Sequence, residues 1–148
     1  MDRLINNESI VICSVLDALN LDVNPIAKLY LYVVMSSDRA IRERLDHYGQ
    51  YEVFIQKESS FYRALNRKFV EFQPMFLNAM TMLLLGGKIE KNSDNGYVLT
   101  LDGLKMLMDL QKKRNGVVSD IEDAVNKLNS LLCSKDVRII YNDLKIVL

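Results

Sequence analysis

The chain has 148 residues, 49% of them apolar, and its 19 basic side chains are matched by 19 acidic ones. This length is enough for one domain that buries its own core without disulfide bonds or metal ions. A formal net charge of zero argues against a strongly basic nucleic-acid-binding protein that acts alone, and it suits a protein whose surface is partly covered by a partner.

Cysteine and histidine are too few for several kinds of site. Cys13 and Cys133 each lie in an apolar stretch predicted to be helical, where a cysteine is typical of the core. His47, the single histidine, lies among charged residues and is interpreted as a surface residue. We therefore expect no catalytic residue, no metal and no cofactor. Since no signal peptide pattern is visible and the apolar runs are too short to cross a bilayer, we expect a cytoplasmic protein with no membrane partner and no small-molecule substrate.

The N-terminal part predicts three helices and a strand. Ile12, Val15, Leu16 and Leu19 recur at helical spacing, which predicts a helix over residues 9–19. Asn24–Pro25 offers a capping side chain followed by a proline suited to the first helical position, which predicts a helix over residues 25–35. A charged helix is expected over residues 38–48, and the β-prone residues 51–56 predict a short strand.

The middle of the chain predicts the order helix, helix, hairpin, helix. A helix is expected over residues 59–72, and Pro74 begins a second helix over residues 74–85, which Gly86–Gly87 ends. The second helix is apolar nearly all round, so it is expected to be buried on several sides. Two segments of strand type, residues 88–91 and 97–100, then flank a turn-rich loop, which predicts a hairpin.

The C-terminal part predicts two helices and a β-type tail. Thr100 caps a helix over residues 101–114. Its expected inward positions are Leu101, Leu104, Leu107 and Met108. The pair Ser119 and Glu122 has capping-box spacing and predicts a helix over residues 120–133. Two short segments of β type end the chain, at residues 137–141 and 144–148.

These elements predict a mainly α (α+β) fold in one domain over residues 1–148. A winged-helix-like module occupies about residues 60–114, between N-terminal helices and a C-terminal helix with short β segments. In a DNA-binding winged helix the second helix enters the major groove, but residues 74–85 contain no arginine or lysine, and bases are read chiefly by such residues. Two interpretations of its apolar side chains remain open, core or partner interface. The candidate interface residues are Phe76, Met80 and Leu84.

Charge is unevenly distributed along the chain. Residues 57–116 hold 10 basic and 6 acidic side chains, whereas both flanking segments are net acidic. The basic residues that could contact nucleic-acid phosphates are Arg63, Arg67, Lys68, Lys88, Lys91, Lys112, Lys113 and Arg114. The alternative is a solvated face, with residues 112–114 complementing the negative end of a helix dipole.

Three strings carry a resemblance to a known family. They are the aromatic helix opened by Asn24–Pro25 and running to Tyr32, the helix–Gly-Gly–hairpin run from Met80 to Thr100, and the tail from Ile139 to Leu144. Over roughly residues 24–146 the chain resembles the small middle (LmuC-like) component of three-component ABC-ATPase systems, the Lamassu-type bacterial antiphage defence operons. The family has no catalytic motif to carry over.

The resemblance implies a non-enzymatic adaptor. Its partners would be an SMC/Rad50-like ATPase that senses foreign DNA, such as phage or plasmid DNA, and an effector subunit of the same operon, commonly a nuclease. The adaptor would help to regulate the effector, and DNA contact would be non-specific and made through the complex. The alternative from a different class is a winged-helix DNA-binding transcriptional regulator, which predicts salt-dependent DNA binding by the isolated chain.

Overall fold

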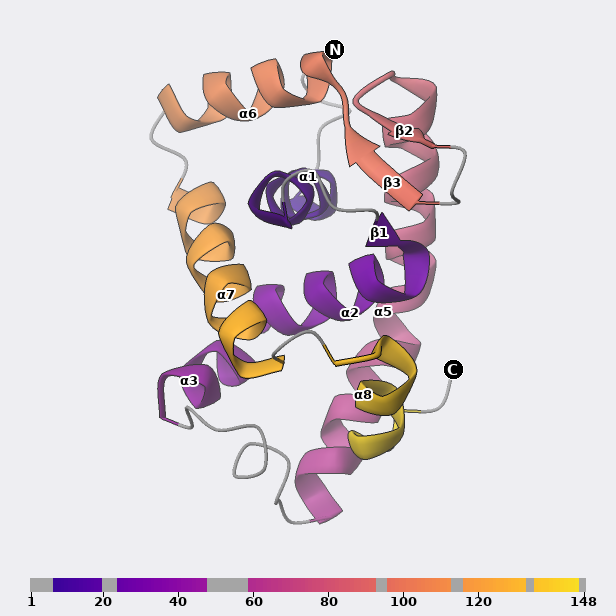
Figure 1. Ribbon diagram of the computed structural model, residues 1–148, viewed down its shortest axis with the longest axis vertical. Coiled ribbons are helices and arrows are strands. Elements are labelled where there is room, and N and C mark those ends of the chain that lie inside the picture. The colour runs from indigo at the N-terminus through magenta and orange to yellow at the C-terminus, as the bar shows by residue number, and fades with distance from the viewer. Residues whose placement is uncertain are drawn as a thin grey trace.

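The computed structural model describes residues 7–19, 24–47, 59–92, 96–112, 116–132 and 135–146. Within these residues the chain is mainly helical and has one small antiparallel sheet, which confirms the mainly α (α+β) class. Two helices lie near the middle of the molecule and the longest helix runs along one side (Figure 1). The elements are α1 (Asn7–Leu19), β1 (Asn24–Pro25), α2 (Ile26–Ser37), α3 (Arg39–His47), α5 (Ser59–Leu85), β2 (Ile89–Lys91), β3 (Gly96–Leu99), α6 (Leu101–Lys112), α7 (Gly116–Leu132) and α8 (Val137–Asp143).

The centre of the core is formed by α1 and α2. Every residue from 9 to 16 in α1 and from 29 to 36 in α2 is buried. The predicted helix is confirmed, and it is buried on more than one side because α1 contacts α2, α5, α6 and α7. Ser14 is tolerated there because its hydroxyl donates to the Ile10 carbonyl at 2.7 Å. Cys13 is fully buried, which confirms it as a core residue, whereas Cys133 lies outside the described residues.

Asn24–Pro25, the segment before α2, forms the short strand β1 and also leads into the helix. Asn24 and Pro25 pair with Tyr97 and Gly96 of β3, and the Asn24 side-chain amide donates to the Tyr97 carbonyl at 3.3 Å. Pro25 is the N-cap of α2, so the predicted start is confirmed to within one residue. The predicted capping role of Asn24 is wrong, since its side chain reaches across the sheet instead.

The predicted hairpin is confirmed and gains a third strand. β2 and β3 pair antiparallel with Lys91 opposite Tyr97, and β1 lies on the other side of β3, giving the order β1-β3-β2. The described elements leading to the hairpin run in the order α1, β1, α2, α3, α5, β2, β3. The sheet is therefore not built from residues 60–114 alone, because its third strand, β1, comes from the N-terminal part of the chain.

The two helices expected over residues 59–72 and 74–85 are one continuous helix, α5, with Pro74 inside it. The expected break is wrong because side chains on both sides of Pro74 pack against the same partner on α2. The Tyr30 ring lies 5.4 Å from the Phe69 ring and 4.7 Å from the Phe76 ring, centroid to centroid. Its hydroxyl also donates to the Phe69 carbonyl. This packing offsets the backbone hydrogen bond that a proline removes from a helix interior.

The predicted end of α5 is confirmed, and its geometry explains the two glycines. The N–H of Lys88 donates to the Leu83 carbonyl at 2.9 Å, and the N–H of Gly87 donates to the Leu84 carbonyl at 3.2 Å. These two bonds form a Schellman motif, which requires the left-handed conformation found at Gly87 (φ 72°). The chain therefore leaves α5 directly into β2.

Helix α6 begins where predicted, but its inward face is only partly the predicted one: Leu107 is buried as expected and Leu104 is half-buried. Thr100 caps it, because its side-chain oxygen accepts from the N–H of Gly103 at 3.1 Å. Gly103 is buried, and a Cβ at this position would lie 2.2 Å from the Lys88 carbonyl oxygen. The face containing Gly103 therefore packs against the hairpin, with Leu107 buried. Leu101 and Met108, both predicted inward, are exposed.

The C-terminal helix α7 has the predicted inward face and an earlier start. Ile121, Val125 and Leu128 are buried as expected. The capping box is wrong, because α7 begins at Gly116 and Ser119 lies inside it.

The β segment predicted over residues 137–141 is also wrong, since residues 137–143 form helix α8. Of the segment predicted over residues 144–148, residues 144–146 form no strand and residues 147–148 lie outside the described residues. Asp136 caps this helix by accepting from the N–H of Arg138 at 2.8 Å. Ile140 is buried, and the Tyr141 hydroxyl donates to the Ala27 carbonyl at 2.8 Å. Tertiary contacts with α2 and α5 thus override the β-prone composition of the segment. The strand predicted over residues 51–56 lies outside the described residues.

Candidate partner interface

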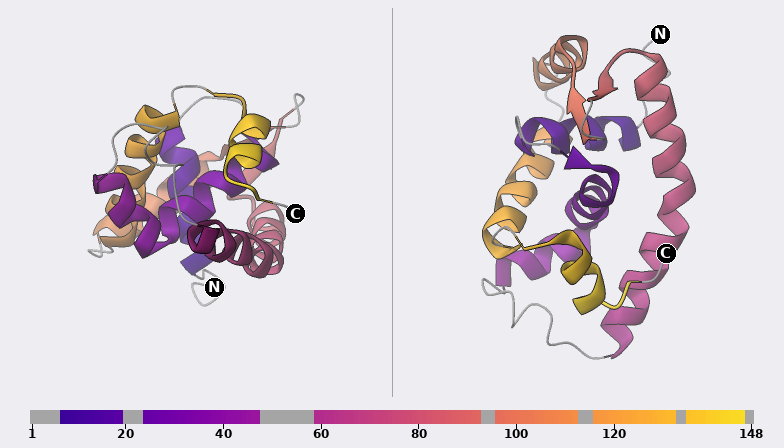
Figure 2. Two further views of the ribbon diagram at one scale, coloured as in Figure 1. Left: turned by 90° about the horizontal axis from the view of Figure 1, so that it is seen from below. Right: turned by 45° about the vertical axis from the view of Figure 1, so that its right-hand side comes forward.

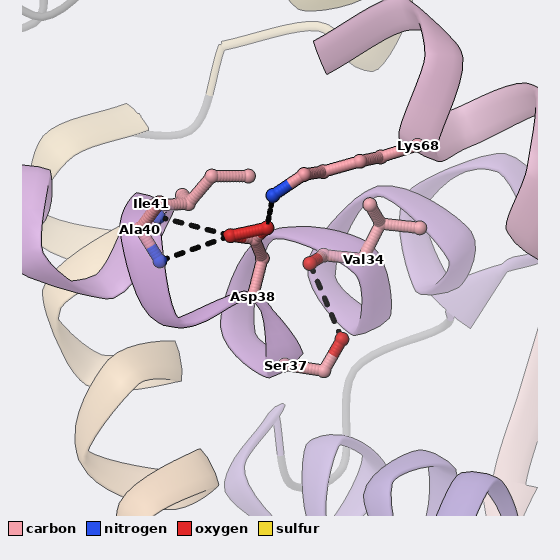
Figure 3. Close-up of polar contacts among 6 residues, drawn as sticks. All are labelled: Val34, Ser37, Asp38, Ala40, Ile41 and Lys68. Carbon is pink, nitrogen blue, oxygen red and sulfur yellow. Dashed lines mark hydrogen bonds and ion pairs between the residues drawn. The ribbon is translucent and has the colours of Figure 1, made fainter. Parts of the chain in front are cut away.

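Lys68, one of the candidate phosphate contacts, is paired with another side chain of the same chain. Its ammonium group forms an ion pair with Asp38, at the start of α3 (Figure 3). Asp38 also accepts hydrogen bonds from the N–H groups of Ala40 at 3.0 Å and Ile41 at 3.3 Å. The Asp38 side chain is only 11% exposed. This carboxylate therefore caps α3 and ties it to α5, so Lys68 has a structural role.

The other predicted basic residues do not form one face. Arg63 and Arg67 are exposed on the N-terminal half of α5. Lys88 and Lys91 lie beyond the C-terminal end of that helix, where the Lys91 ammonium is 6.0 Å from the centre of the Tyr97 ring. Because a helix rises 1.5 Å per residue, Arg67 and Leu85 are about 27 Å apart.

Of the predicted basic residues at the end of α6, the structure describes only Lys112, which is exposed as the last residue of that helix, while Lys113 and Arg114 lie outside the described residues. Among the described residues, one continuous α5 separates Arg63 and Arg67 from Lys88 and Lys91, which favours the alternative of a solvated surface.

Two of the three predicted interface residues belong to the core. Phe76 is 1% exposed and Met80 is 3% exposed, and both lie on the side of α5 that faces α1 and α2. Neither side chain can touch a partner while the domain is folded. Leu84 is 39% exposed and remains a candidate.

Apart from Leu84, the exposed apolar surface of α5 lies at positions that the sequence did not single out. Six large apolar side chains of this helix are exposed: Val70, Met75, Leu77, Met82, Leu84 and Leu85. The helix was expected to be buried on several sides, and this is wrong. An apolar residue at nearly every position hides the phase of the helix, so only the packing against Tyr30 decides which side is inside. Val70, Leu77 and Leu84 are seven residues apart, but so are the buried Phe69, Phe76 and Leu83, so spacing alone does not identify the exposed stripe.

An apolar groove of about 530 Å³ lies beside this surface. It is formed where α2, α5 and α8 meet, and its lining includes Ile26, Tyr30, Leu77 and Tyr141. Ile26 and Leu77 are exposed at its rim. Burial and the nearby Tyr30 hydroxyl raise the pKa of Tyr141 well above its usual range, so the groove holds no ionised phenol. A groove of this kind can accept an apolar side chain from another molecule.

Charged residues gather in a second groove, between α3 and α7, but their charges are balanced locally. Arg39 pairs with Glu43 at 3.3 Å, and Lys127 pairs with Asp123 at 3.1 Å. All four side chains are well exposed, and such ion pairs contribute little to binding or stability. This groove therefore favours no particular charged ligand.

The described residues contain no group of three or more side chains suited to hold a metal ion. Burial raises the pKa of the Cys13 thiol to about 12, so this cysteine is unreactive at neutral pH. Among the described helices, none is both long enough and apolar enough to span a membrane. Comparison with protein-family models, curated proteins and solved structures gives no match for this chain.

Proposed function

We propose that this chain is a non-enzymatic adaptor subunit that binds another protein through the exposed apolar surface of α5. The observation that carries the proposal is the set of six large apolar side chains exposed on that one helix. Exposed apolar patches mark interaction sites, and three of the six residues, Val70, Leu77 and Leu84, lie on the same side of the helix. The adjoining groove supplies a concave feature in which an anchoring side chain can be buried.

The family resemblance adds the identity of the partners. In Lamassu-type systems they would be an SMC/Rad50-like ATPase that senses foreign DNA and an effector, commonly a nuclease, encoded in the same operon. In this role the adaptor acts in the cytoplasm as part of an antiphage or antiplasmid complex and helps to regulate the effector. Its own chemistry is limited to binding, which agrees with the apolar character of the surface on α5.

Co-purification tests this proposal. The tagged chain is expressed together with its neighbouring genes, and the lysate is treated with nuclease before capture. We expect the encoded ATPase to be recovered in stoichiometric amount from the wild-type chain. Recovery of the tagged chain without any ATPase or effector would contradict the adaptor function.

A winged-helix DNA-binding regulator is the second candidate, favoured by the order of elements α1, β1, α2, α5, β2 and β3. The C-terminal half of α5 would then be the recognition helix, yet its exposed positions include Leu77, Met82 and Leu84 and no basic residue. Direct reading of bases therefore has little support. Binding of the isolated chain to duplex DNA at low salt, lost when Arg63 and Arg67 are replaced by glutamate, would favour the regulator.

A further inference from the structure

Helix α5 runs along one edge of the molecule (Figure 2, right). A line of exposed residues follows almost the whole length of this helix. Successive members are alternately four and three residues apart, which is the spacing of contact positions between two helices in a coiled coil. All of them are exposed, and we call them the α5 seam: Arg63, Arg67, Val70, Pro74, Leu77, Thr81 and Leu84. The seam is thus shaped to lie against a second long helix.

The chemistry of the seam changes along its length. Its first two members are arginines, and neither forms an ion pair with another described residue. Its later members are apolar or small, and Leu77 also borders the groove between α2, α5 and α8. A helix lying along the seam would cover both guanidinium groups, which is favourable only if it places carboxylates beside them.

The same charges argue against a second copy of this chain as the occupant. In a parallel pair, Arg63 and Arg67 would lie beside the same residues of the other copy. Like charges in facing positions destabilise that arrangement. In an antiparallel pair centred on Leu77, the two arginines would lie beyond the end of α5 of the other copy, and the seam contains no acidic residue that could pair with them.

We propose that the α5 seam is the docking site for an amphipathic helix of a different protein. That helix has apolar residues in heptad register opposite Val70, Leu77 and Leu84, and it has acidic residues opposite Arg63 and Arg67. One of its apolar side chains enters the groove beside Leu77. The inference rests on the proposed adaptor function and specifies the chemistry of the partner segment.

The test uses the full chain and the operon-encoded ATPase, purified separately after nuclease treatment. Affinity is measured by titration calorimetry for Leu77→Asp and for the double variant Arg63→Glu, Arg67→Glu. We expect each to bind at least about tenfold more weakly than the wild type. Circular dichroism melts check that both variants remain folded, as expected for exposed positions.

Two matched controls test whether the loss of affinity is specific to substitutions in the seam. Asn78 is exposed on α5 and belongs neither to the seam nor to the six exposed apolar residues, so Asn78→Asp should bind within about twofold of the wild type. Lys91 on β2 and Lys112 at the end of α6 are exposed outside the seam, so Lys91→Glu with Lys112→Glu should do the same. Cross-linking then locates the partner helix, and replacing its acidic residues with lysine should restore binding to the Arg63→Glu, Arg67→Glu variant.

Each contrary outcome has its own meaning. If the wild type binds the ATPase but every seam variant binds equally well, the inference is wrong and the adaptor function stands. If Leu77→Asp weakens binding and charge reversal does not, the acidic character of the partner helix is wrong. A wild-type dimer that Leu77→Asp converts to a monomer would show that a second copy occupies the seam. If the wild type binds neither the ATPase nor the effector, both proposals are wrong.

Discussion

Glu122 and Asp17 bring two carboxyl groups together where α7 packs against α1. Burial, together with the hydrogen bond to Asp17 and the negative charge of Asp17, raises the pKa of Glu122 from its ordinary value of 4.5 to about 7. Two carboxyl groups in contact share a proton more readily than they lose both. The folded protein therefore holds a proton here that the unfolded chain releases.

The pH dependence of stability follows from this difference. Because the folded-state pKa of Glu122 is raised, the stabilisation is complete below the ordinary pKa of 4.5 and is lost as the pH rises through about 7. Glu122→Gln removes the charge, so its urea midpoint should exceed that of the wild type at about pH 8, with a smaller difference at about pH 5. Glu90→Gln, at an exposed position on β2, is the control. An equal shift at both pH values would contradict the assigned pKa.

At the scale of single residues, the sequence predicted best the helix caps and helix ends, because these depend on residues that are close in the chain. The Thr100 cap and the end of α5 at Gly87 each depend on hydrogen bonds between residues three to five positions apart. The Thr100 hydroxyl also donates to the Gly87 carbonyl in the turn that precedes the hairpin. Such signals act locally and can be read directly. Ser119 had an equally good local pattern, yet α7 extends past it to Gly116. A capping box marks a possible helix start, and packing of Val118 against the core decides whether it is used.

At the scale of elements, the least predictable feature is the continuity of α5 through Pro74. A proline in a helix interior costs about 3 kcal/mol because it removes a hydrogen bond and crowds the preceding turn. Pro74 is exposed, so replacing it leaves no cavity. Pro74→Ala should therefore raise the free energy of unfolding, by about 1–3 kcal/mol.

Urea denaturation measures this effect, with Asn78→Ala as the control. Asn78 is exposed one turn further along α5 and has an N–H of its own, so its replacement should change stability by less than about 0.7 kcal/mol. A loss of stability in Pro74→Ala would mean that the proline fixes a bend on which the contacts of Phe69 and Phe76 with Tyr30 depend.

Elements that depend on distant contacts could not be read from their own residues. The segment of α8 is rich in β-branched and aromatic residues, and it becomes helical because Ile140 and Tyr141 dock on α2 and α5. β1 is only two residues long and exists because β3, more than seventy positions later, offers it a free edge. The β propensity of a short segment is easily outweighed by tertiary contacts of this kind.

At the scale of the whole molecule, the candidate interface was only partly predictable, because it depends on which side of α5 is buried. The sequence pointed to this helix as a candidate, since an apolar helix without basic residues is poorly suited to read DNA. It selected Phe76 and Met80, which are buried, and missed Leu77, which is exposed. No periodicity within the helix separates these positions, because the phase is set by α1 and α2 packing on one side.

This division between the two sides of α5 makes a direct prediction about stability. Leu77 and Leu84 are exposed, so Leu77→Gln with Leu84→Gln should change the free energy of unfolding by no more than about 0.5 kcal/mol per site. Phe76→Ala, one position away, removes a buried ring beside Tyr30 and should cost about 3–5 kcal/mol. Urea denaturation of the three proteins measures both effects. A large loss of stability from the leucine substitutions would place the seam in the core and remove the surface on which the adaptor function rests.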